Sequence, residues 1–275
     1  DNISYYEINI EVKMEKEKSL GNQALIRGLR LLDILSNYPN GCPLAKLAEL
    51  ANLNKSTAHR LLQGLQNEGY VKPANAAGSY RLTIKCLSIG QKVLSSMNII
   101  HMASPYLEQL NLKLGETINF SKREDDHAIM IYKLEPTNGM LKTRAYIGQY
   151  LKLYCSAMGK IFLAYEKKVD YLSHYWQSHQ REIKKLTRYT ITELDDIKLE
   201  LETIRQTAYA MDREENELGV TCIACPIFDS FGQVEYAISV SMSIYRLNKF
   251  GTDAFLQEIR KTAEQISLEL GYENI

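Results

Sequence analysis

The sequence predicts an α+β protein: an N-terminal winged helix-turn-helix domain, a linker helix, and a C-terminal α/β domain with an antiparallel sheet. Three observations support this fold class. The chain has 275 residues, a length typical of two domains. Its first third contains three short helical patterns followed by a hairpin pattern, and the remainder interleaves strand and helix patterns. The charge also changes sign between these two parts.

Positive charge is concentrated in the first third. The whole chain has 33 Lys/Arg and 33 Asp/Glu, so its formal net charge is zero. Residues 21–92 contain nine Lys/Arg and three Asp/Glu, a surplus of six, which leaves 24 against 30 in the rest. This asymmetry is typical of a DNA-binding module fused to a domain that does not contact DNA.

The composition limits the class of protein and the compartment in which it is expected to work. Hydrophobic residues make up 45% and charged residues 24%, as in ordinary globular proteins. The sequence contains no apolar run of membrane-span length and no signal-peptide pattern, so we expect a cytoplasmic protein that does not contact membranes. Five scattered cysteines fit a reducing compartment. Residues 1–20 include a solvated charge run and are interpreted as an extension outside the fold.

The predicted N-terminal domain covers residues 21–83. A helix over 24–38 ends before Pro39, because the residue preceding a proline disfavours helical backbone. Pro43 suits the first turn of a short second helix over 44–51. A tight turn at 52–54 leads to a third helix, which completes the helix-turn-helix order.

The third helix, Asn54 to Gly69, has an unusual polar face. Asn54 is the predicted N-cap and Gly69 the left-handed residue that ends the helix. The apolar stripe consists of Ala58, Leu61, Leu62 and Leu65. The opposite face carries donors and short hydroxyls, namely Lys55, Ser56, Thr57, His59, Arg60 and Gln63. An ordinary solvated face would mix both signs of charge, so this face favours DNA phosphates and base edges.

Two short strands follow, at 70–73 and 79–83, around a small-residue tip. This hairpin is the wing, and Lys72 and Arg81 are its predicted phosphate contacts. The N-terminal motifs resemble those of the IclR family of bacterial transcription regulators. They are Ala24-Leu25, Arg27, Leu31-Leu32, Leu44, Leu47-Ala48, Lys55-Ser56-Thr57, His59-Arg60-Leu61-Leu62, Glu68-Gly69-Tyr70-Val71 and Tyr80-Arg81-Leu82.

A linker helix is expected over 84–102, with an apolar stripe suited to a dimer contact. The C-terminal domain is expected over 103–275. Its first helix is predicted to begin at Ser104-Pro105, as N-cap and first residue, and to end at Gly115. Strands are predicted at 117–121, 128–135, 220–228 and 234–241, and helices at 161–165, 190–208 and 252–270. Residues 166–189 are given no role.

The C-terminal segments resemble the effector-binding domain of the same family, which implies a GAF/profilin-like fold. The similar stretches are Gly115-Glu-Thr, Ser156-Ala-Met-Gly-Lys160, Ala210 to Ala224 with Asp212 and Cys222, and Ser239-Val-Ser241. With the N-terminal motifs, the resemblance covers about residues 22–272. It implies that a small organic-acid effector contacts Ala157, Gly159, Asp212, Cys222, Ser239 and Ser241.

Each effector residue also has a purely structural explanation. The small residues at 156–159 could form a close-packed turn, the two serines could bond to neighbouring backbone, and Asp212 could be a turn residue. Ser239 and Ser241 lie two apart on a strand and therefore share a face, where buried hydroxyls need partners. Among the pocket residues, hydroxyls, a thiol and helix N–H groups favour a keto or sugar acid over an aromatic ligand.

No catalytic or metal motif stands out. Cys222-Ile-Ala-Cys225 lies in a predicted strand, where positions three apart face opposite sides, so the pair is interpreted as accidental. We therefore expect no cofactor, no metal site and no enzyme activity. The predicted function is a homodimeric or homotetrameric repressor that binds a palindromic operator in double-stranded DNA under effector control. An activator of the same architecture, or a small-molecule enzyme with a protein-binding N-terminal domain, are the alternatives.

Overall fold

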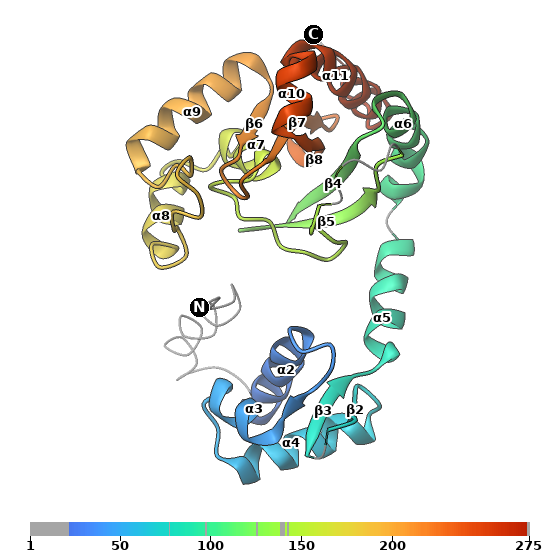
Figure 1. The fold of residues 1–275 in the computed structure, drawn as a ribbon, viewed down its shortest axis with the longest axis vertical. Coiled ribbons are helices and arrows are strands. Elements are labelled where there is room, and N and C mark those ends of the chain that lie inside the picture. The colour runs from blue at the N-terminus through green and yellow to red at the C-terminus, as the bar shows by residue number, and fades with distance from the viewer. Residues whose placement is uncertain are drawn as a thin grey trace. The chain divides into compact units, whose positions relative to one another are not determined.

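The computed structural model describes residues 22–76, 78–96, 98–124, 126–137, 141 and 143–273. They form two compact units that divide between residues 96 and 97. Figure 1 shows the elements of both units. The expected extension at 1–20 lies outside the described residues.

The N-terminal unit is a winged helix-turn-helix, as predicted. Its three-stranded antiparallel sheet has the order β1-β3-β2, and the apolar sides of α2, α3 and α4 enclose a core with Leu31, Leu47 and Leu62. The short strand β1, which pairs with β3, was not predicted. The elements are α2 (Gln23–Ser36), β1 (Cys42–Pro43), α3 (Leu44–Leu50), α4 (Lys55–Asn67), β2 (Val71–Pro73), β3 (Ser79–Leu82) and α5 (Ile84–Ser95).

The C-terminal unit is built on a five-stranded antiparallel sheet with the order β5-β4-β8-β7-β6. This confirms the predicted α+β class. Its strands are β4 (Thr117–Glu124), β5 (His127–Leu134), β6 (Ala210–Arg213), β7 (Val220–Phe228) and β8 (Val234–Ser243). Its helices are α6 (Asn98–Leu114), α7 (Ala157–Ala164), α8 (Tyr171–Ser178), α9 (Leu194–Thr207), α10 (Ile244–Phe250) and α11 (Thr252–Glu269).

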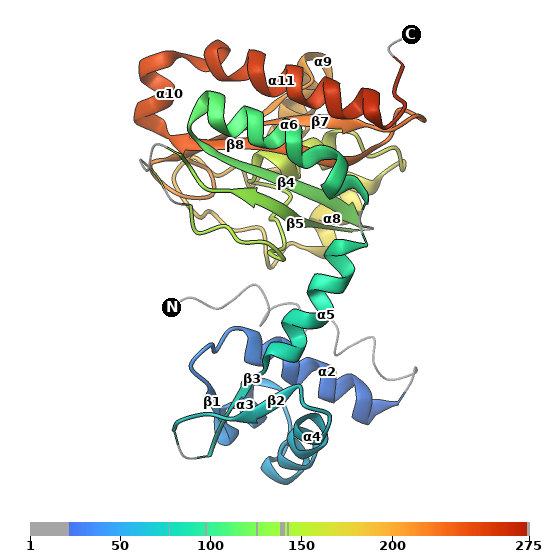
Figure 2. The same cartoon turned by 90° about the vertical axis from the view of Figure 1, so that its right-hand side faces the viewer.

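Helices cover both faces of this sheet. Figure 2 shows α6 and α11 together on one face, where α11 contacts β7 and β8. Helix α7 packs against β6, β7 and β8 on the other face, with α9 beside it. The Ser121 hydroxyl of β4 contacts the Met158 sulfur of α7 (3.1 Å). Because side chains alternate along a strand, Ser239 and Ser241 of β8 lie on this same face, and Val240 lies on the opposite one.

The predicted start of the first C-terminal helix at Ser104-Pro105 is wrong. The segment expected as one linker helix over 84–102 is divided between α5 and α6, and α6 runs through Pro105. A proline inside a helix leaves the carbonyl four residues earlier, here that of His101, without its N–H donor. The Ser104 hydroxyl donates to the His101 carbonyl oxygen (3.5 Å), which partly replaces the lost hydrogen bond.

Candidate DNA-binding helix and effector site

Helix α4 begins with a side-chain cap. The Asn54 Oδ1 accepts hydrogen bonds from the backbone N–H of Thr57 (2.8 Å) and from the Ser56 hydroxyl (2.9 Å). The apolar residues Ala58 and Leu62 are fully buried. The backbone of Gly69 is left-handed (φ +76°), as predicted. The cap marks where α4 begins, and the buried stripe decides which face of α4 points to solvent.

That exposed face carries most of the side chains predicted to contact DNA. Lys55, Ser56, His59, Arg60 and Gln63 are exposed, whereas Thr57, whose backbone N–H binds the cap, is half-buried. Helix α4 contains no Asp or Glu from its first residue to its last. The face is therefore a continuous surface of donors and positive charge.

The two wing residues lie opposite each other on neighbouring strands. Lys72 on β2 pairs in register with Arg81 on β3. The Lys72 side chain is exposed, whereas Arg81 is half-buried. The Arg81 Nε atom is buried and has no hydrogen-bond partner among the residues that the structure describes.

In the C-terminal unit, small polar side chains form two rows across the sheet on the face that α7 covers. Asn119 of β4 lies opposite Ser239 of β8 in one row. The other row consists of successive cross-strand neighbours, namely Thr117, Ser241, Cys222 and Asp212. The register therefore brings four of the six predicted effector residues side by side on one face.

Asn119 connects the two serines. Its Nδ2 donates to the Ser241 Oγ (2.9 Å) and to the Ser239 Oγ (3.2 Å). The Cys222 Sγ and the Ser241 Oγ are 3.1 Å apart, and either atom could donate. Burial and the nearby Asp212 carboxylate raise the pKa of the Cys222 thiol far above its ordinary value, so it is neutral and not nucleophilic.

The other two predicted effector residues lie in the first turn of α7. The helix is capped by Ser156, whose hydroxyl oxygen accepts from the backbone N–H of Gly159 (3.1 Å). Ala157 is buried. A Cβ at Gly159 would lie 2.5 Å from the Leu153 Cα and 2.8 Å from the Leu153 carbonyl oxygen. Close packing alone therefore accounts for glycine at this position.

Replacing Gly159 with alanine is expected to destabilise the protein by about 1–3 kcal/mol, because the new Cβ meets backbone atoms that cannot move independently. Thermal or urea unfolding of the purified variant measures this. Gly64→Ala in α4 is the matched control: a Cβ there would meet nothing within 4 Å, so it should be neutral or stabilising by up to about 1 kcal/mol. Equal stability of wild type and Gly159→Ala would contradict the packing explanation.

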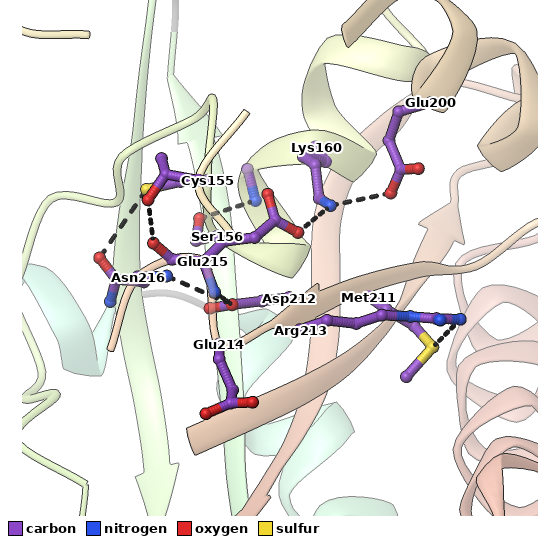
Figure 3. A network of polar contacts seen from close by, with 12 residues as sticks. Cys155, Ser156, Lys160, Glu200, Met211, Asp212, Arg213, Glu214, Glu215 and Asn216 are labelled. Atoms are coloured by element: carbon purple, nitrogen blue, oxygen red, sulfur yellow. Dashed lines mark hydrogen bonds and ion pairs between the residues drawn. The ribbon is translucent and has the colours of Figure 1, made fainter. Parts of the chain in front are cut away.

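A buried lysine lies one turn further along α7. The Lys160 Nζ is 2.6 Å from the Glu215 Oε1 and 2.8 Å from the Glu200 Oε1, as Figure 3 shows. Its side chain is completely buried. Burial alone would lower the pKa of Lys160, but the two carboxylates outweigh it and the pKa is raised, so Lys160 stays charged. This network joins α7, α9 and the turn after β6.

The turn after β6 also holds Asp212 in place. The Asp212 Oδ1 accepts from the backbone N–H groups of Glu215 (2.7 Å) and Asn216 (3.3 Å). Asp212 is buried, with 4% of its surface exposed. Burial, together with the nearby negative charge of Glu215, raises the pKa of Asp212 to about 7.

Comparison with known proteins decides the family. Residues 91–268 match the family described as bacterial transcriptional regulator IclR C-terminal, and residues 24–74 match the IclR helix-turn-helix domain. The chain belongs to the IclR family. The family assignment rests on both parts of the chain, so it does not depend on the helix-turn-helix pattern alone.

Individual relatives of this IclR-family chain agree. It is 99% identical over 268 residues to an HTH-type transcriptional regulator of Haemophilus influenzae (98% of this chain, 100% of that protein). It is 64% identical over 262 residues to the DNA-binding transcriptional repressor YiaJ of Escherichia coli (95% and 93%). A crystal structure of transcriptional regulator YaiJ, 62% identical, matches with a TM-score of 0.62 over 64% of this chain and 96% of that one.

The IclR-family chain is thus a DNA-binding transcription regulator and not an enzyme, and the alternative of a small-molecule enzyme is set aside. None of the helices that the structure describes could cross a membrane. Within the same described residues, no cluster of His, Cys, Asp and Glu could hold a metal ion. The two cysteines of the C-x-x-C pattern pair with different β8 residues, Cys222 with Ser241 and Cys225 with Ile238, on opposite faces of the sheet.

Sequence reasoning missed Asn119 and Lys160. Asn119 had a detectable signal, because Thr117, Asn119 and Ser121 alternate with Ile118 and Phe120 and so predict a polar face on a buried strand. Lys160 had none, since its partners lie 40 and 55 residues further along the chain.

A cavity of about 430 Å³ lies between α9 and β6. Its lining includes Glu200, Arg213 and Glu215, but none of the six predicted effector residues.

The raised pKa of Asp212 predicts a pH-dependent stability. The folded pKa of about 7 lies above the ordinary value of 3.8, so the neutral form is favoured by folding. The stability that the neutral Asp212 side chain adds to the fold is fully present below about pH 4 and is lost as the pH rises through about 7. The difference in unfolding free energy between Asp212→Asn and wild type should therefore increase, in favour of the variant, by on the order of 1–4 kcal/mol from pH 4 to pH 8.

Urea unfolding at several pH values measures this difference for Asp212→Asn. Asp195→Asn is the control, because the Asp195 side chain is 92% exposed and pairs with Lys198 on the surface. A constant difference between wild type and Asp212→Asn from pH 4 to pH 8 would contradict the raised pKa. The charged neighbours Glu215 and Lys160 are unchanged in both variants.

Proposed function

We propose that this regulator represses transcription by binding a palindromic operator as a dimer, and that a small organic acid in the C-terminal domain controls its operator affinity. The observation that carries the proposal is the exposed face of α4, which has donors and positive charge and no carboxylate. The name of the 64% identical relative, a transcriptional repressor, supports repression.

In this proposal the first two turns of α4 enter the major groove. Arg60 and His59 contact bases or phosphates, and Gln63 lies on the same face. Lys55 contacts phosphate, while Ser56 and Thr57 hold the DNA backbone near the N-terminus of the helix, where unpaired N–H groups favour anions. Lys72 and Arg81 of the wing contact phosphates beside the groove.

A dimer is supported by apolar side chains that are exposed in the single chain. On α5, Ile84 is 85% exposed and Leu87 is 62% exposed. Water-exposed side chains of this size on one helix are typical of a contact with another chain. A two-fold dimer places two copies of α4 on two half-sites, which is why the proposed operator is palindromic.

The effector proposal rests on the face of the sheet below α7. Ser239, Ser241 and the neutral Cys222 thiol provide hydroxyl and thiol groups, and Ala157 in the first turn of α7 adds a backbone N–H group beside Gly159, whose own N–H caps the helix. Asp212, with a pKa near 7, can be neutral beside an acid. An effector that prefers one arrangement of the protein would shift the population that binds DNA.

Selection of bound duplexes from a random-sequence pool, followed by fluorescence anisotropy, tests the proposal. We expect a palindromic consensus whose affinity changes at least tenfold when a bound organic acid is present. Transcription in vitro from a promoter overlapping that site should decrease on adding the protein. Absence of a selected sequence would contradict DNA recognition, and increased transcription would show an activator.

A further inference from the structure

We propose that Asn119 is the residue that selects the effector, and that the ligand is a hydroxy acid whose hydroxyl group donates to the Asn119 Oδ1. This rests on the proposed function, in which the same face of the sheet binds a small organic acid. The proposal adds a contact residue from β4 and a chemical requirement beyond the carboxylate.

The evidence begins with an unpaired buried oxygen. Asn119 is 3% exposed, and both hydrogens of its Nδ2 are used on Ser239 and Ser241. Its Oδ1 is buried and has no hydrogen-bond partner among the described residues. Buried polar atoms are nearly always paired, and an unpaired one costs free energy. A ligand that places a donor beside the Asn119 Oδ1 would remove this cost.

The orientation of the amide follows from counting donors and acceptors. Rotating the amide by 180° would exchange the Oδ1 and the Nδ2 and turn an acceptor toward the two serines. In the observed orientation the Nδ2 donates to both serine oxygens, and the Oδ1 is the one acceptor left unpaired. The group available to a ligand is therefore an acceptor, and it selects a donor such as a hydroxyl group.

The same hydrogen bonds prepare the serines to bind an anion. Because the Ser239 and Ser241 oxygens accept from Asn119, their hydroxyl hydrogens are directed elsewhere. Ser241 can share its hydrogen with the Cys222 sulfur, whereas Ser239 has no acceptor assigned in the described residues. The hydroxyl groups of Ser239 and Ser241 and the side-chain carbonyl of Asn119 thus lie on neighbouring positions of β8 and β4. Two donors beside one acceptor suit a carboxylate next to a hydroxyl group.

Lys133 bonds residues 143 and 145 to the strand beside Asn119. Lys133 is the cross-strand neighbour of Asn119 and shares its face. The Lys133 Nζ donates to the carbonyl oxygens of Ala145 (2.8 Å) and Thr143 (3.3 Å). The Thr143 Oγ1 is a second buried oxygen without a hydrogen-bond partner in the described chain. Lys133 therefore attaches residues 143 and 145 to the β5 position beside Asn119.

Isothermal titration calorimetry of the full-length chain with matched acids tests the proposal. The pairs are lactate with propionate and gluconate with hexanoate, which differ only in hydroxyl groups. In wild type we expect at least one hydroxy acid to bind about tenfold or more tightly than its partner. Asn119→Leu should reduce this preference to less than about threefold. If circular dichroism shows that the leucine variant is not folded, Asn119→Ala is measured in its place.

Asn119→Asp is the control for the acceptor, because it keeps an oxygen in place of the Oδ1 while losing both Nδ2 donors to the serines. The lost donors and the negative charge should weaken the binding of both acids of a pair while leaving their affinity ratio above about tenfold. An unchanged preference in Asn119→Leu, or no preference in wild type, would overturn the role of Asn119. Failure of every acid to bind, or binding that is unaffected by Ser239→Ala and Ser241→Ala, would instead overturn the effector site itself.

Discussion

Replacing Arg60 with alanine is expected to weaken operator binding by about 10- to 100-fold, the effect of losing one good contact to a base or phosphate. Arg60 is exposed on the face of α4 that carries no carboxylate. Its removal leaves the core of the N-terminal unit intact, since Ala58 and Leu62 make the buried contacts of that helix. Fluorescence anisotropy with the selected operator measures the loss.

Gln66→Ala is the matched control for Arg60→Ala. Gln66 is also exposed on α4, but it lies in the last turn, away from the N-terminal donors. Its substitution should change operator affinity less than about threefold, because it makes no contact in the proposed complex. Equal losses for the two variants, or no loss for Arg60→Ala, would remove Arg60 from the proposed interface.

The largest effect on stability is expected for Lys160→Met, about 3–5 kcal/mol of destabilisation. The side chain of Lys160 is completely buried between Glu200 and Glu215. Methionine fills a similar volume but leaves the Glu215 carboxylate buried without a positive charge, and burial already raises the pKa of Glu215. Urea unfolding of the variant at neutral pH measures the loss.

Two further variants separate charge from packing. Adding Glu215→Gln to Lys160→Met should recover part of the stability, because no unpaired carboxylate then remains at that position. Lys198→Met breaks an exposed pair with Asp195 (2.9 Å) and should cost less than about 1 kcal/mol. Similar losses for Lys160→Met and Lys198→Met would show that the buried network does not stabilise the fold.

The N-terminal domain was predictable because its signals are local. The signals for α4 all lie between residues 54 and 69, and each has the predicted role in the structure. They are the Asn54 cap, the buried Ala58 and Leu62, and the left-handed Gly69. Alternating polar and apolar residues likewise predicted β8 and the shared face of Ser239 and Ser241. Where side chains two or four positions apart decide which face of a helix or strand is buried, the sequence pattern is sufficient to predict that element.

The missed features depend on residues far apart in the chain. Pro105 looked like a helix start because nothing in the local pattern shows that α6 begins at Asn98. The short strands β1 and β6 contain few residues, and each is defined by its partner strand. The Lys160 ion pairs and the Asn119 bridge arise only once α9 and β8 are in place. Such contacts follow from tertiary packing, which a single sequence pattern does not encode.

The most direct test of the account is the salt dependence of operator affinity for wild type and for a variant that combines Lys55→Gln, Lys72→Gln and Arg81→Gln. Each lost phosphate contact should reduce the slope of log affinity against log salt by about 0.9. We expect the variant to have a slope smaller by about 2–3. An unchanged slope would mean that α4 and the wing do not contact the DNA backbone.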